Sequence, residues 1–413
     1  MNQYLNKKSL ADLDLANKRV VVRFDFNVPI KDGKITDDKR ITAALKTIKY
    51  LLDQNCSIVA LSHLSRIKSI EDIKSNKKTL APVAKRLGEL LPGIEVKFEP
   101  STDFNKISAS ANNLKPKQIL LLENTRYYDV NDNNEVVKRE SKNNPELAKF
   151  YASLGVAFVN DAFGTAHRAH ASNAGIASLM KDSCLGFLVE NEIKNISKAI
   201  DNPSHPYVAI LGGAKVSDKI KVITNLLTKC DKIIIGGGMA FTFAGAEGKQ
   251  IGKSINEPDM YPLAKEMLTN SRDKLVLTVD SKCSPDYADL KPEIYNLDDG
   301  IPHHLEGLDI GPKTVEAFVK VIKQAKTIVW NGPCGVTEFK NYYAEGTRAV
   351  AQAVKEATQN GCYSLIGGGD SASAIIQLGF KESDFSFIST GGGAALTLIE
   401  GSPLKGLDPI PTK

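Results

Sequence analysis

The six cysteines of this chain of 413 residues are scattered, and no two of them form a C-x-x-C pair. This spacing excludes a disulfide framework and a cysteine-based zinc site, and it is typical of proteins from a reducing compartment. The opening residues, MNQYLNKKSLADLDL, contain no apolar segment like that of a secretory leader. No uninterrupted apolar run is long enough for a membrane-spanning helix. We therefore expect a cytoplasmic protein with no membrane partner.

The charged residues form no basic block. Lys and Arg number 53 against 48 Asp and Glu, which gives a net charge of +5, and the basic residues are spread along the chain. A concentrated basic tail of the kind that binds nucleic acid is therefore lacking, and we expect no nucleic-acid partner. The length favours two or three domains, and a hydrophobic content of 42% is ordinary for a folded soluble protein.

The standard nucleotide-binding motifs are absent as well. The chain has no G-x-x-x-x-G-K-[ST], because the similar stretch at 248–254, GKQIGKS, has one residue too few between its glycines. No H-R-D or D-F-G pair of a protein kinase and no Ser-His-Asp or Cys-His arrangement stands out. No G-x-G-x-x-G fingerprint follows a strand-like run, which weighs against an NAD-dependent dehydrogenase. That alternative shares the α/β pattern, and tight NADH binding would favour it.

What the chain does contain is a repeated alternation of strand-like and helical stretches, which predicts mostly parallel sheets with ligands beyond the carboxyl ends of the strands. In the first half these ends carry arginine, histidine and amide side chains. They are Arg23, Asp25, Asn27, His63, Arg66, Asn124, Arg126, His167, Arg168 and His170, with Arg40 at the start of a helix as a further candidate. One arginine after a strand is usually a solvated surface residue. Arginine at four strand ends favours a site for a small polyanion, because guanidinium forks match phosphate and carboxylate oxygens. The lysine-rich segment 67–78 is predicted to be a solvated loop.

In the second half, glycine clusters follow the strand-like runs. They lie at 212–213, 236–238, 367–369 and 391–393, with Asn331-Gly332-Pro333 after a further run. One such turn is weak support, but several on one sheet favour a nucleotide pocket, because glycine turns let backbone amides approach phosphate. Asp370 is the best candidate for holding Mg²⁺ on nucleotide phosphates. Two anion sites together suggest phosphoryl transfer between a small phosphate-bearing acid and a nucleotide.

The segment between the two halves, 185–200, predicts a helix. Leu185, Val189, Ile193, Ile196 and Ile200 recur at helical spacing, and Pro203 lies just beyond. Periodicity alone is typical of an ordinary packing helix. The different chemistry on its two sides favours a connector between domains.

Six stretches make the chain resemble the phosphoglycerate kinase family over nearly its whole length. They are RFDFNVP (23–29), NDAFGTAHRAHAS (160–172), GGAKVSDKI (212–220), WNGPCGVTE (330–338), GGGDS (367–371) and STGGGA (389–394), in the family's order. The resemblance implies an α/β fold of two Rossmann-like lobes, each a parallel sheet in a three-layer α/β/α arrangement, joined by a central helix and hinge. Residues 1–184 would form the phosphoglycerate-binding lobe, with 403–413 packing back on it. Residues 185–201 would form the connecting helix and 202–402 the nucleotide-binding lobe.

The resemblance also implies the reaction, which is that of a phosphotransferase with a carboxyl group as acceptor. Phosphoglycerate kinases of glycolysis transfer a phosphoryl group reversibly between 1,3-bisphosphoglycerate and ADP, giving 3-phosphoglycerate and ATP. The implied transfer is Mg²⁺-dependent, direct and in line after hinge closure, with no covalent enzyme intermediate. The implied partners are these small molecules, and the implied state is a cytoplasmic monomer.

Carried over position by position, the resemblance implies three sets of site residues. Phosphoglycerate would be bound by Asp25, Phe26, Asn27, Arg40, His63, Leu64, Ser65, Arg66, Arg126 and Arg168. The nucleotide would be bound by Gly213, Lys219, Gly307, Glu338, Gly368, Gly369, Asp370 and Ser371, with Asp370 positioning the phosphates that carry Mg²⁺. The transferring group would be stabilised by Arg40, Lys215, Gly391, Gly392 and Gly393.

Two short stretches depart from the family pattern. The chain has His63-Leu64-Ser65-Arg66-Ile67 where the family commonly has HLGRP, and residues 303–306 are HHLE instead of the usual DGWM. An alternative function is a non-catalytic nucleotide- or phosphate-binding module that keeps the fold. The presence of Arg40, Lys215, Lys219 and Asp370 argues against it, because loss of activity usually removes charges that only the transition state needs.

Overall fold

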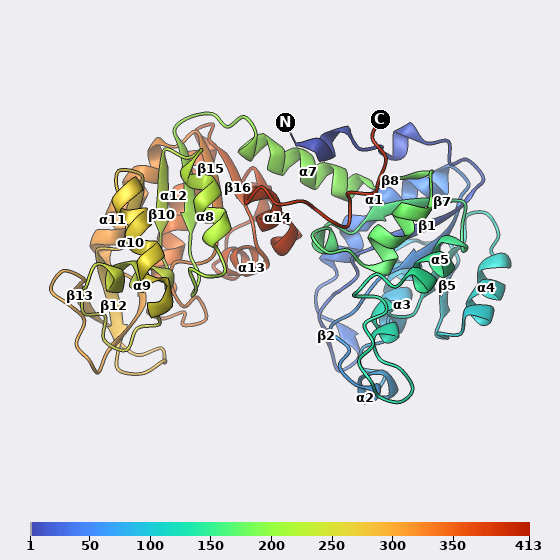
Figure 1. Cartoon of the computed structure of the whole chain (residues 1–413), viewed down its shortest axis with the longest axis horizontal. Helices are drawn as coiled ribbons and strands as arrows, with labels where there is room; N and C mark the ends of the chain where they lie inside the picture. The colour runs from blue at the N-terminus through green and yellow to red at the C-terminus, as the bar shows by residue number, and fades with distance from the viewer. Residues whose placement is uncertain (1) are drawn as a thin grey trace. The chain divides into compact units, whose positions relative to one another are not determined.

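The computed structural model describes residues 2–413, with the backbone alone for Asp370. The chain divides into two compact units (Figure 1), Met1–Lys194 with Pro403–Lys413, and Asn195–Ser402. We call them the N-terminal unit and the C-terminal unit. The domain limits implied by the resemblance, with a connector at 185–201, stay a prediction.

The N-terminal unit is built on a six-stranded parallel sheet with the strand order β5-β6-β4-β1-β7-β8. The strands are β1 (Arg19–Phe24), β4 (Ser57–Leu61), β5 (Val96–Glu99), β6 (Ile119–Leu122), β7 (Ala157–Asp161) and β8 (Ser183–Leu185). The central strands are buried along their length, as expected of a parallel sheet with helices on both faces. Because β1 pairs with β4 on one side and β7 on the other, the strand order reverses there. Such a switch point is where open α/β sheets bind ligands.

The helices of this unit are α1 (Lys39–Asp53), α2 (Ile70–Lys74), α3 (Ala81–Leu90), α4 (Phe104–Asn112), α5 (Pro145–Ala152) and α6 (Ile176–Leu179), and a hairpin of β2 (Ile30–Lys31) and β3 (Lys34–Ile35) precedes α1. Ile41 and Ile48 of α1 pack in the same core as Val20 and Val22 of β1. The prediction that 67–78 is a loop is wrong for residues 70–74, which form α2. This helix of five residues is too short to show a helical period, and a side-chain cap at Ser69 starts it.

The C-terminal unit repeats the architecture, with the strand order β11-β10-β9-β15-β16-β17. The strands are β9 (Tyr207–Leu211), β10 (Lys232–Ile235), β11 (Leu275–Leu277), β15 (Thr327–Asn331), β16 (Tyr363–Ile366) and β17 (Phe387–Ile388). The helices are α8 (Ile220–Leu227), α9 (Met239–Ala246), α10 (Tyr261–Ser271), α11 (Pro312–Gln324), α12 (Glu345–Gln359), α13 (Gly369–Gln377) and α14 (Gly392–Ile399). The switch point lies between β9 and β15, which pair in parallel. The predicted fold class, two Rossmann-like α/β lobes, is confirmed.

A second, antiparallel sheet of the C-terminal unit was not expected from the alternation. It consists of β12 (Asp280–Ser284), β13 (Glu293–Asn296) and β14 (Glu306–Ile310), in the order β13-β12-β14. Strand β11 ends at Leu277, and β12 then begins at Asp280. This small sheet supplies one wall of the cavity described below.

The helix predicted for 185–200 is present as α7 (Phe187–Ile200), but it begins two residues later than predicted, and Leu185 is the last residue of β8. The other four periodic residues lie in α7, and all five are buried. Asp161 at the end of β7 holds its beginning, because Oδ1 accepts from the amide of Leu188 at 2.9 Å. Burial raises the pKa of the Asp161 carboxyl to about 6. Across residues 2–413, no helix has the length and apolar character required to cross a membrane.

Candidate active site

The carboxyl ends of β1, β4, β6 and β7 bring together the arginine-rich set predicted from the sequence. Asp25, just after β1, accepts a hydrogen bond from Arg40 Nη1 at 2.7 Å, and the Arg40 side chain is 37% exposed. Gly164, in the turn after β7, packs against the Asp25 side chain, because a Cβ at this position would lie 2.2 Å from Asp25 Oδ2. This packing at the switch point fixes the carboxylate that orients Arg40.

Asn27 and Arg126 clamp the backbone of Ser65 from two strand ends. Asn27 Oδ1 accepts from the Ser65 amide at 2.8 Å, and Arg126 Nη1 donates to the Ser65 carbonyl at 2.6 Å. Ser65 has φ +57°, a left-handed conformation that favours glycine and costs other residues roughly 1–2 kcal/mol. The serine that replaces the family's usual glycine is thus held in a bend that glycine adopts freely.

Phe26 and Leu64 belong to the core through their side chains, which are 0% and 2% exposed. Phe26 stacks on Phe24 with ring centroids 4.9 Å apart, and its amide donates to Ser62 Oγ at 2.9 Å. Asn124 bonds both the amide and the carbonyl of Leu64. Any contact of Phe26 or Leu64 with a small ligand would therefore use the backbone.

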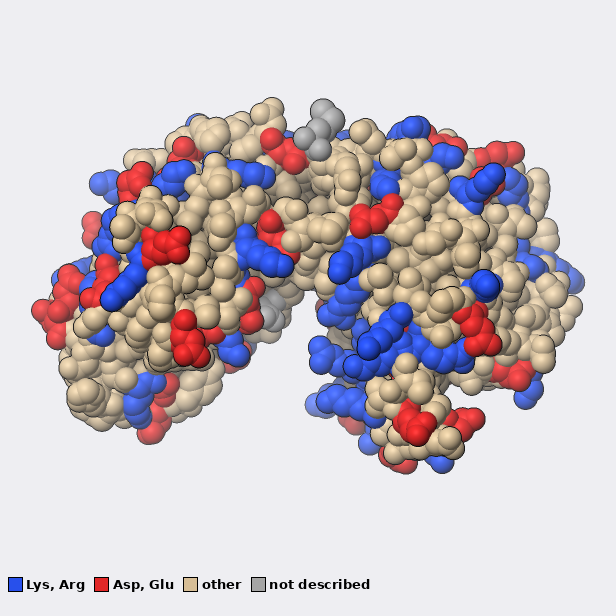
Figure 2. Space-filling view, in the orientation of Figure 1, with Lys and Arg blue, Asp and Glu red and all other residues tan. Residues whose placement is uncertain are grey.

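The remaining arginines differ in exposure. Arg66 and Arg168 are exposed, whereas Arg126 is buried. Burial, together with the charges of Arg23 and Arg168, lowers the pKa of the Arg126 guanidinium. Arg126 Nε is also buried without a hydrogen-bond partner among the described residues. Figure 2 shows Lys and Arg side chains gathered on the N-terminal unit, over the region of β2 in Figure 1. A polyanionic ligand would relieve this repulsion.

Three histidines lie among these arginines, and all of them favour the neutral form. Burial lowers the pKa of His63 well below its usual value, and the nearby charges of Arg23 and Arg126 lower it further. Burial likewise lowers the pKa of His167 to about 4 and that of His170 to about 3, again with help from arginine. The positive charge of the site at neutral pH therefore comes from its arginines.

In the C-terminal unit, the ends of β9, β15 and β16 meet at the switch point. The Lys219 ammonium donates to the Asn331 side chain and to its carbonyl oxygen, the latter at 3.2 Å. Asn331 Nδ2 donates to the Gly367 carbonyl at 2.6 Å, and the Gly332 amide donates to Ser371 Oγ at 2.7 Å. These bonds bring Lys219, Ser371 and the turn before α13 together. The side chain of Asp370 lies outside the described residues.

The glycine cluster at 391–393 packs directly on the one at 367–369. A Cβ at Gly392 would lie 2.8 Å from the Gly369 amide nitrogen and 2.9 Å from Gly368 Cα. The Gly391 amide donates to Ser389 Oγ at 3.2 Å, and Gly393 is exposed. The first turns of α13 and α14 therefore lie side by side, with their amides at one edge of the sheet.

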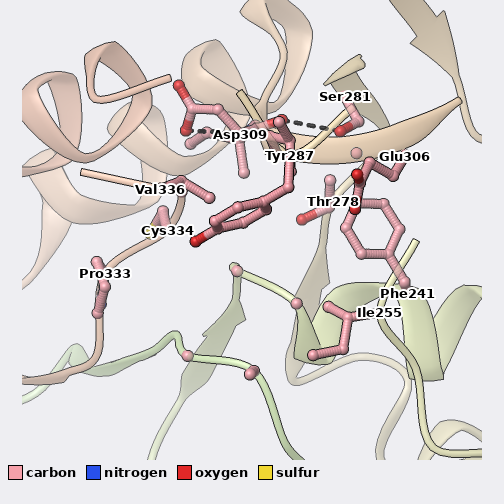
Figure 3. Close-up of a pocket in the computed structure, with 18 of the residues that line it drawn as sticks. Phe241, Ile255, Thr278, Ser281, Tyr287, Glu306, Asp309, Pro333, Cys334 and Val336 are labelled. Carbon is pink, nitrogen blue, oxygen red and sulfur yellow. Dashed lines mark hydrogen bonds between the residues drawn. The ribbon is translucent and has the colours of Figure 1, made fainter. Parts of the chain in front are cut away.

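Beside this edge lies a cavity of about 320 Å³, shown in Figure 3. Gly213, Gly307 and Glu338, all predicted from the sequence, line it. A Cβ at Gly307 would lie 2.2 Å from the Phe241 ring, so only glycine leaves this wall flat. The lining is mostly apolar, which suits the flat face of a nucleobase better than a phosphate.

The apolar residues of this cavity were not predicted from the sequence. Phe241 lies in α9, Ile255 and Tyr287 lie in two loops, and none of the three belongs to a motif. Tyr287 is 65% exposed, and its ring reaches into the middle of the cavity (Figure 3). Exposure of a large apolar group is a signal for Ile255 and Tyr287, but it appears only in the folded structure. Phe241 is 4% exposed and gives no such signal.

The whole chain is similar in sequence and in structure to known phosphoglycerate kinases. A family model described as phosphoglycerate kinase matches residues 10–402. The phosphoglycerate kinase of Spiroplasma citri is 50% identical over an alignment of 421 residues that covers 99% of this chain and 100% of the relative. That of Listeria innocua is 53% identical over 407 residues, covering 98% of this chain and 100% of its own. Among solved structures, phosphoglycerate kinase from Coxiella burnetii matches with a TM-score of 0.84 and 39% identity, covering 98% of both chains. The enzyme from Pyrococcus horikoshii matches with a TM-score of 0.80 and 31% identity, covering 97% of this chain and 98% of its own.

Proposed function

Because this chain belongs to the phosphoglycerate kinase family, whose members transfer a phosphoryl group to a carboxyl acceptor, we propose that it catalyses the reversible Mg²⁺-dependent reaction of 1,3-bisphosphoglycerate with ADP. The products are 3-phosphoglycerate and ATP. The observation that carries the proposal is the pairing of an arginine-rich anion site in one unit with a glycine-rich site and an apolar cavity in the other. We further propose that the chain acts as a cytoplasmic monomer.

In the proposed complex, phosphoglycerate is bound at the strand ends of the N-terminal unit. Arg126 and Arg168 meet its anionic oxygens, Arg66 adds a third guanidinium, and Asp25 and Asn27 accept from its hydroxyl. His63 and Ser65 complete the site, while Phe26 and Leu64 contribute backbone groups. Support comes from the repulsion that Arg23 and Arg168 exert on the Arg126 guanidinium and from the clamp on Ser65.

The nucleotide is proposed to place its base in the apolar cavity, with Gly213 and Gly307 as flat walls and Glu338 on the ribose. Its phosphates extend to Lys219, Gly368, Gly369 and Ser371. Within the described residues, no group of three or more His, Cys, Asp or Glu could hold a metal ion, which suits Mg²⁺ held mainly by phosphate oxygens. Asp370 is the proposed protein ligand, and the metal would neutralise phosphate charge.

Transfer is proposed to be direct and in line, with Arg40, Lys215 and the amides of Gly391, Gly392 and Gly393 facing the transferring group. Because the two substrates bind to different units, the proposal includes hinge closure that excludes water. We expect the radius of gyration from X-ray scattering to decrease when 3-phosphoglycerate and MgATP are both present. Scattering profiles that are identical with and without both substrates would contradict the closure.

The proposed function is tested by incubating the purified chain with MgATP and 3-phosphoglycerate and following the acyl phosphate with a coupled assay. Turnover with phosphoglycerate and none with other small acids would support the proposal. Absence of turnover alongside normal MgADP binding would favour the non-catalytic binding module.

Replacing Arg168 with alanine is expected to raise the KM for 3-phosphoglycerate about tenfold or more, since a hydrogen bond to a charged group is lost. Arg168 is exposed and follows β7, so its removal leaves no cavity in the core. The KM for MgATP should stay within about twofold of the wild-type value, because the nucleotide site is in the other unit. Steady-state kinetics with each substrate varied in turn measures both. An equal rise in the KM for MgATP would contradict the assignment of the two substrates to separate units.

A further inference from the structure

Beneath the proposed phosphoglycerate site, a buried chain of polar groups connects His63 to Glu140 and Ser172, which have no assigned role. Arg23, Glu140 and Ser172 are all 0% exposed, and His63 is 5% exposed. Arg23 Nε donates to Ser172 Oγ at 2.7 Å, and Arg23 Nη2 lies 3.1 Å from His63 Nδ1. The Ser172 hydroxyl donates to Glu140 Oε1, and the Ser172 amide donates to Glu140 Oε2 at 3.1 Å. The network thus runs from Glu140 through Ser172 and Arg23 to His63.

The hydrogen-bond polarity of this network is determined at the His63 end. A guanidinium has only donors, so the contact between Arg23 Nη2 and His63 requires Nδ1 to accept. A neutral imidazole that accepts at Nδ1 carries its proton on Nε2. Burial and the nearby arginines lower the pKa of His63 well below its usual value, so the doubly protonated ring is disfavoured. The second nitrogen of His63 is therefore a hydrogen-bond donor.

The polarity is determined at the other end as well. Ser172 Oγ accepts from Arg23, so its single proton is free to go to Glu140. Both carboxyl oxygens of Glu140 then accept from Ser172, one from the hydroxyl and one from the amide. The carboxylate form of Glu140 accepts from both donors and balances the buried Arg23 charge. A protonated Glu140 would carry a hydroxyl that also has to donate, and it would leave the Arg23 charge unbalanced.

We propose that Glu140 and Ser172 are positioning residues that hold the Arg23 guanidinium against His63, and thereby fix His63 as the Nε2–H tautomer that donates a hydrogen bond to bound phosphoglycerate. The inference rests on the proposed function, because it assigns a donor to that same site. Glu140 and Ser172 themselves act only through Arg23. A purely structural role would be limited to tying the segment around Glu140 to β1.

The first measurement is the tautomer of His63 in the full chain, read from the side-chain ¹⁵N chemical shifts in a long-range ¹H–¹⁵N spectrum. The His63→Gln variant identifies the signals. In the wild type we expect an unprotonated Nδ1 and a protonated Nε2. In Ser172→Ala, which removes the acceptor of Arg23 Nε, we expect a mixture of tautomers. The KM for 3-phosphoglycerate should rise about tenfold, the effect of weakening one hydrogen bond, with the KM for MgATP unchanged.

Three further variants make the test specific. Ser183 of β8 is also 0% exposed, and its Oγ has no hydrogen-bond partner among the described residues, so Ser183→Ala is a matched control that should change neither readout. Ser172→Thr keeps the hydroxyl and should restore the wild-type tautomer. Glu140→Gln keeps the side-chain volume but places an amide NH₂ group where Ser172 needs an acceptor. It should therefore change the His63 tautomer and the KM for 3-phosphoglycerate in the same direction as Ser172→Ala. In the double variant, the two effects on KM should not add, because both substitutions interrupt one network.

A protonated Nδ1 in the wild type, or an unchanged His63 tautomer in folded Ser172→Ala, would overturn the inference. Additive effects of Ser172→Ala and Glu140→Gln would also overturn it. Absence of turnover in the wild type, together with the expected tautomer and its loss in Ser172→Ala, would contradict the proposed function and still support the hydrogen-bond assignment. The two failures are therefore distinguishable.

Discussion

Replacing Arg40 with alanine is expected to lower kcat by about 10³-fold or more, the range measured for arginines that stabilise a phosphoryl group in transfer. Arg40 is the second residue of α1, and Asp25 orients its guanidinium through a contact of 2.7 Å. Its side chain is partly exposed, so truncation should leave the core packing intact. The coupled assay gives kcat, and circular dichroism with the melting temperature verifies the fold.

Arg86 offers a matched control for this substitution. It is a partly exposed arginine of the same unit whose guanidinium pairs with Asp38 and Glu89. Arg86→Ala should leave kcat unchanged, and Arg40→Lys should keep the charge while losing the fork that guanidinium presents to phosphate. A folded Arg40→Ala protein with kcat within a few-fold of the wild-type value would contradict the role assigned to Arg40.

The parts of the two sites that could be predicted from the sequence are those set by parallel-sheet geometry. The carboxyl ends of parallel strands meet at one edge, so Asp25, His63 and Arg126 could be grouped from their places after three strand-like runs. The glycine turns after β9 and β16 could be grouped in the same way. The central helix was also predictable, because its buried residues recur at steps of three and four.

The parts that could not be predicted depend on contacts between residues without local pattern. Tyr287 and Ile255 reach the cavity from loops whose sequences show no regular apolar spacing. Glu140 lies in a segment rich in charged and polar residues, 129–141, that shows no helical or strand period, yet it is 0% exposed. A buried carboxylate in such a segment can be recognised only when its partners, Ser172 and Arg23, are placed by the fold.

Lys215 and Lys219 of the stretch 212–220 also look alike in sequence and differ in structure. Lys219 is bonded to Asn331 at the end of β15, so its ammonium is fixed at the edge of the sheet. Lys215 is exposed on the loop between β9 and α8. Ser217 two residues later donates to Glu257 from its amide at 3.0 Å, which ties down this loop. This difference suits a binding role for Lys219 and a transfer role for Lys215.

Lys215→Ala is accordingly expected to lower kcat by about 10²–10³-fold, the effect of removing one group that stabilises developing charge. Affinity for MgADP, measured by isothermal titration calorimetry, should change by less than about threefold, because the ammonium interacts most strongly with the phosphoryl group in transfer. Lys221, an exposed lysine of α8, is the matched control, and Lys221→Ala should alter neither quantity. If Lys215→Ala weakens MgADP binding by the same factor as it lowers kcat, the ammonium acts on the bound nucleotide in the ground state. A binding role shared with Lys219 would then replace the transfer role.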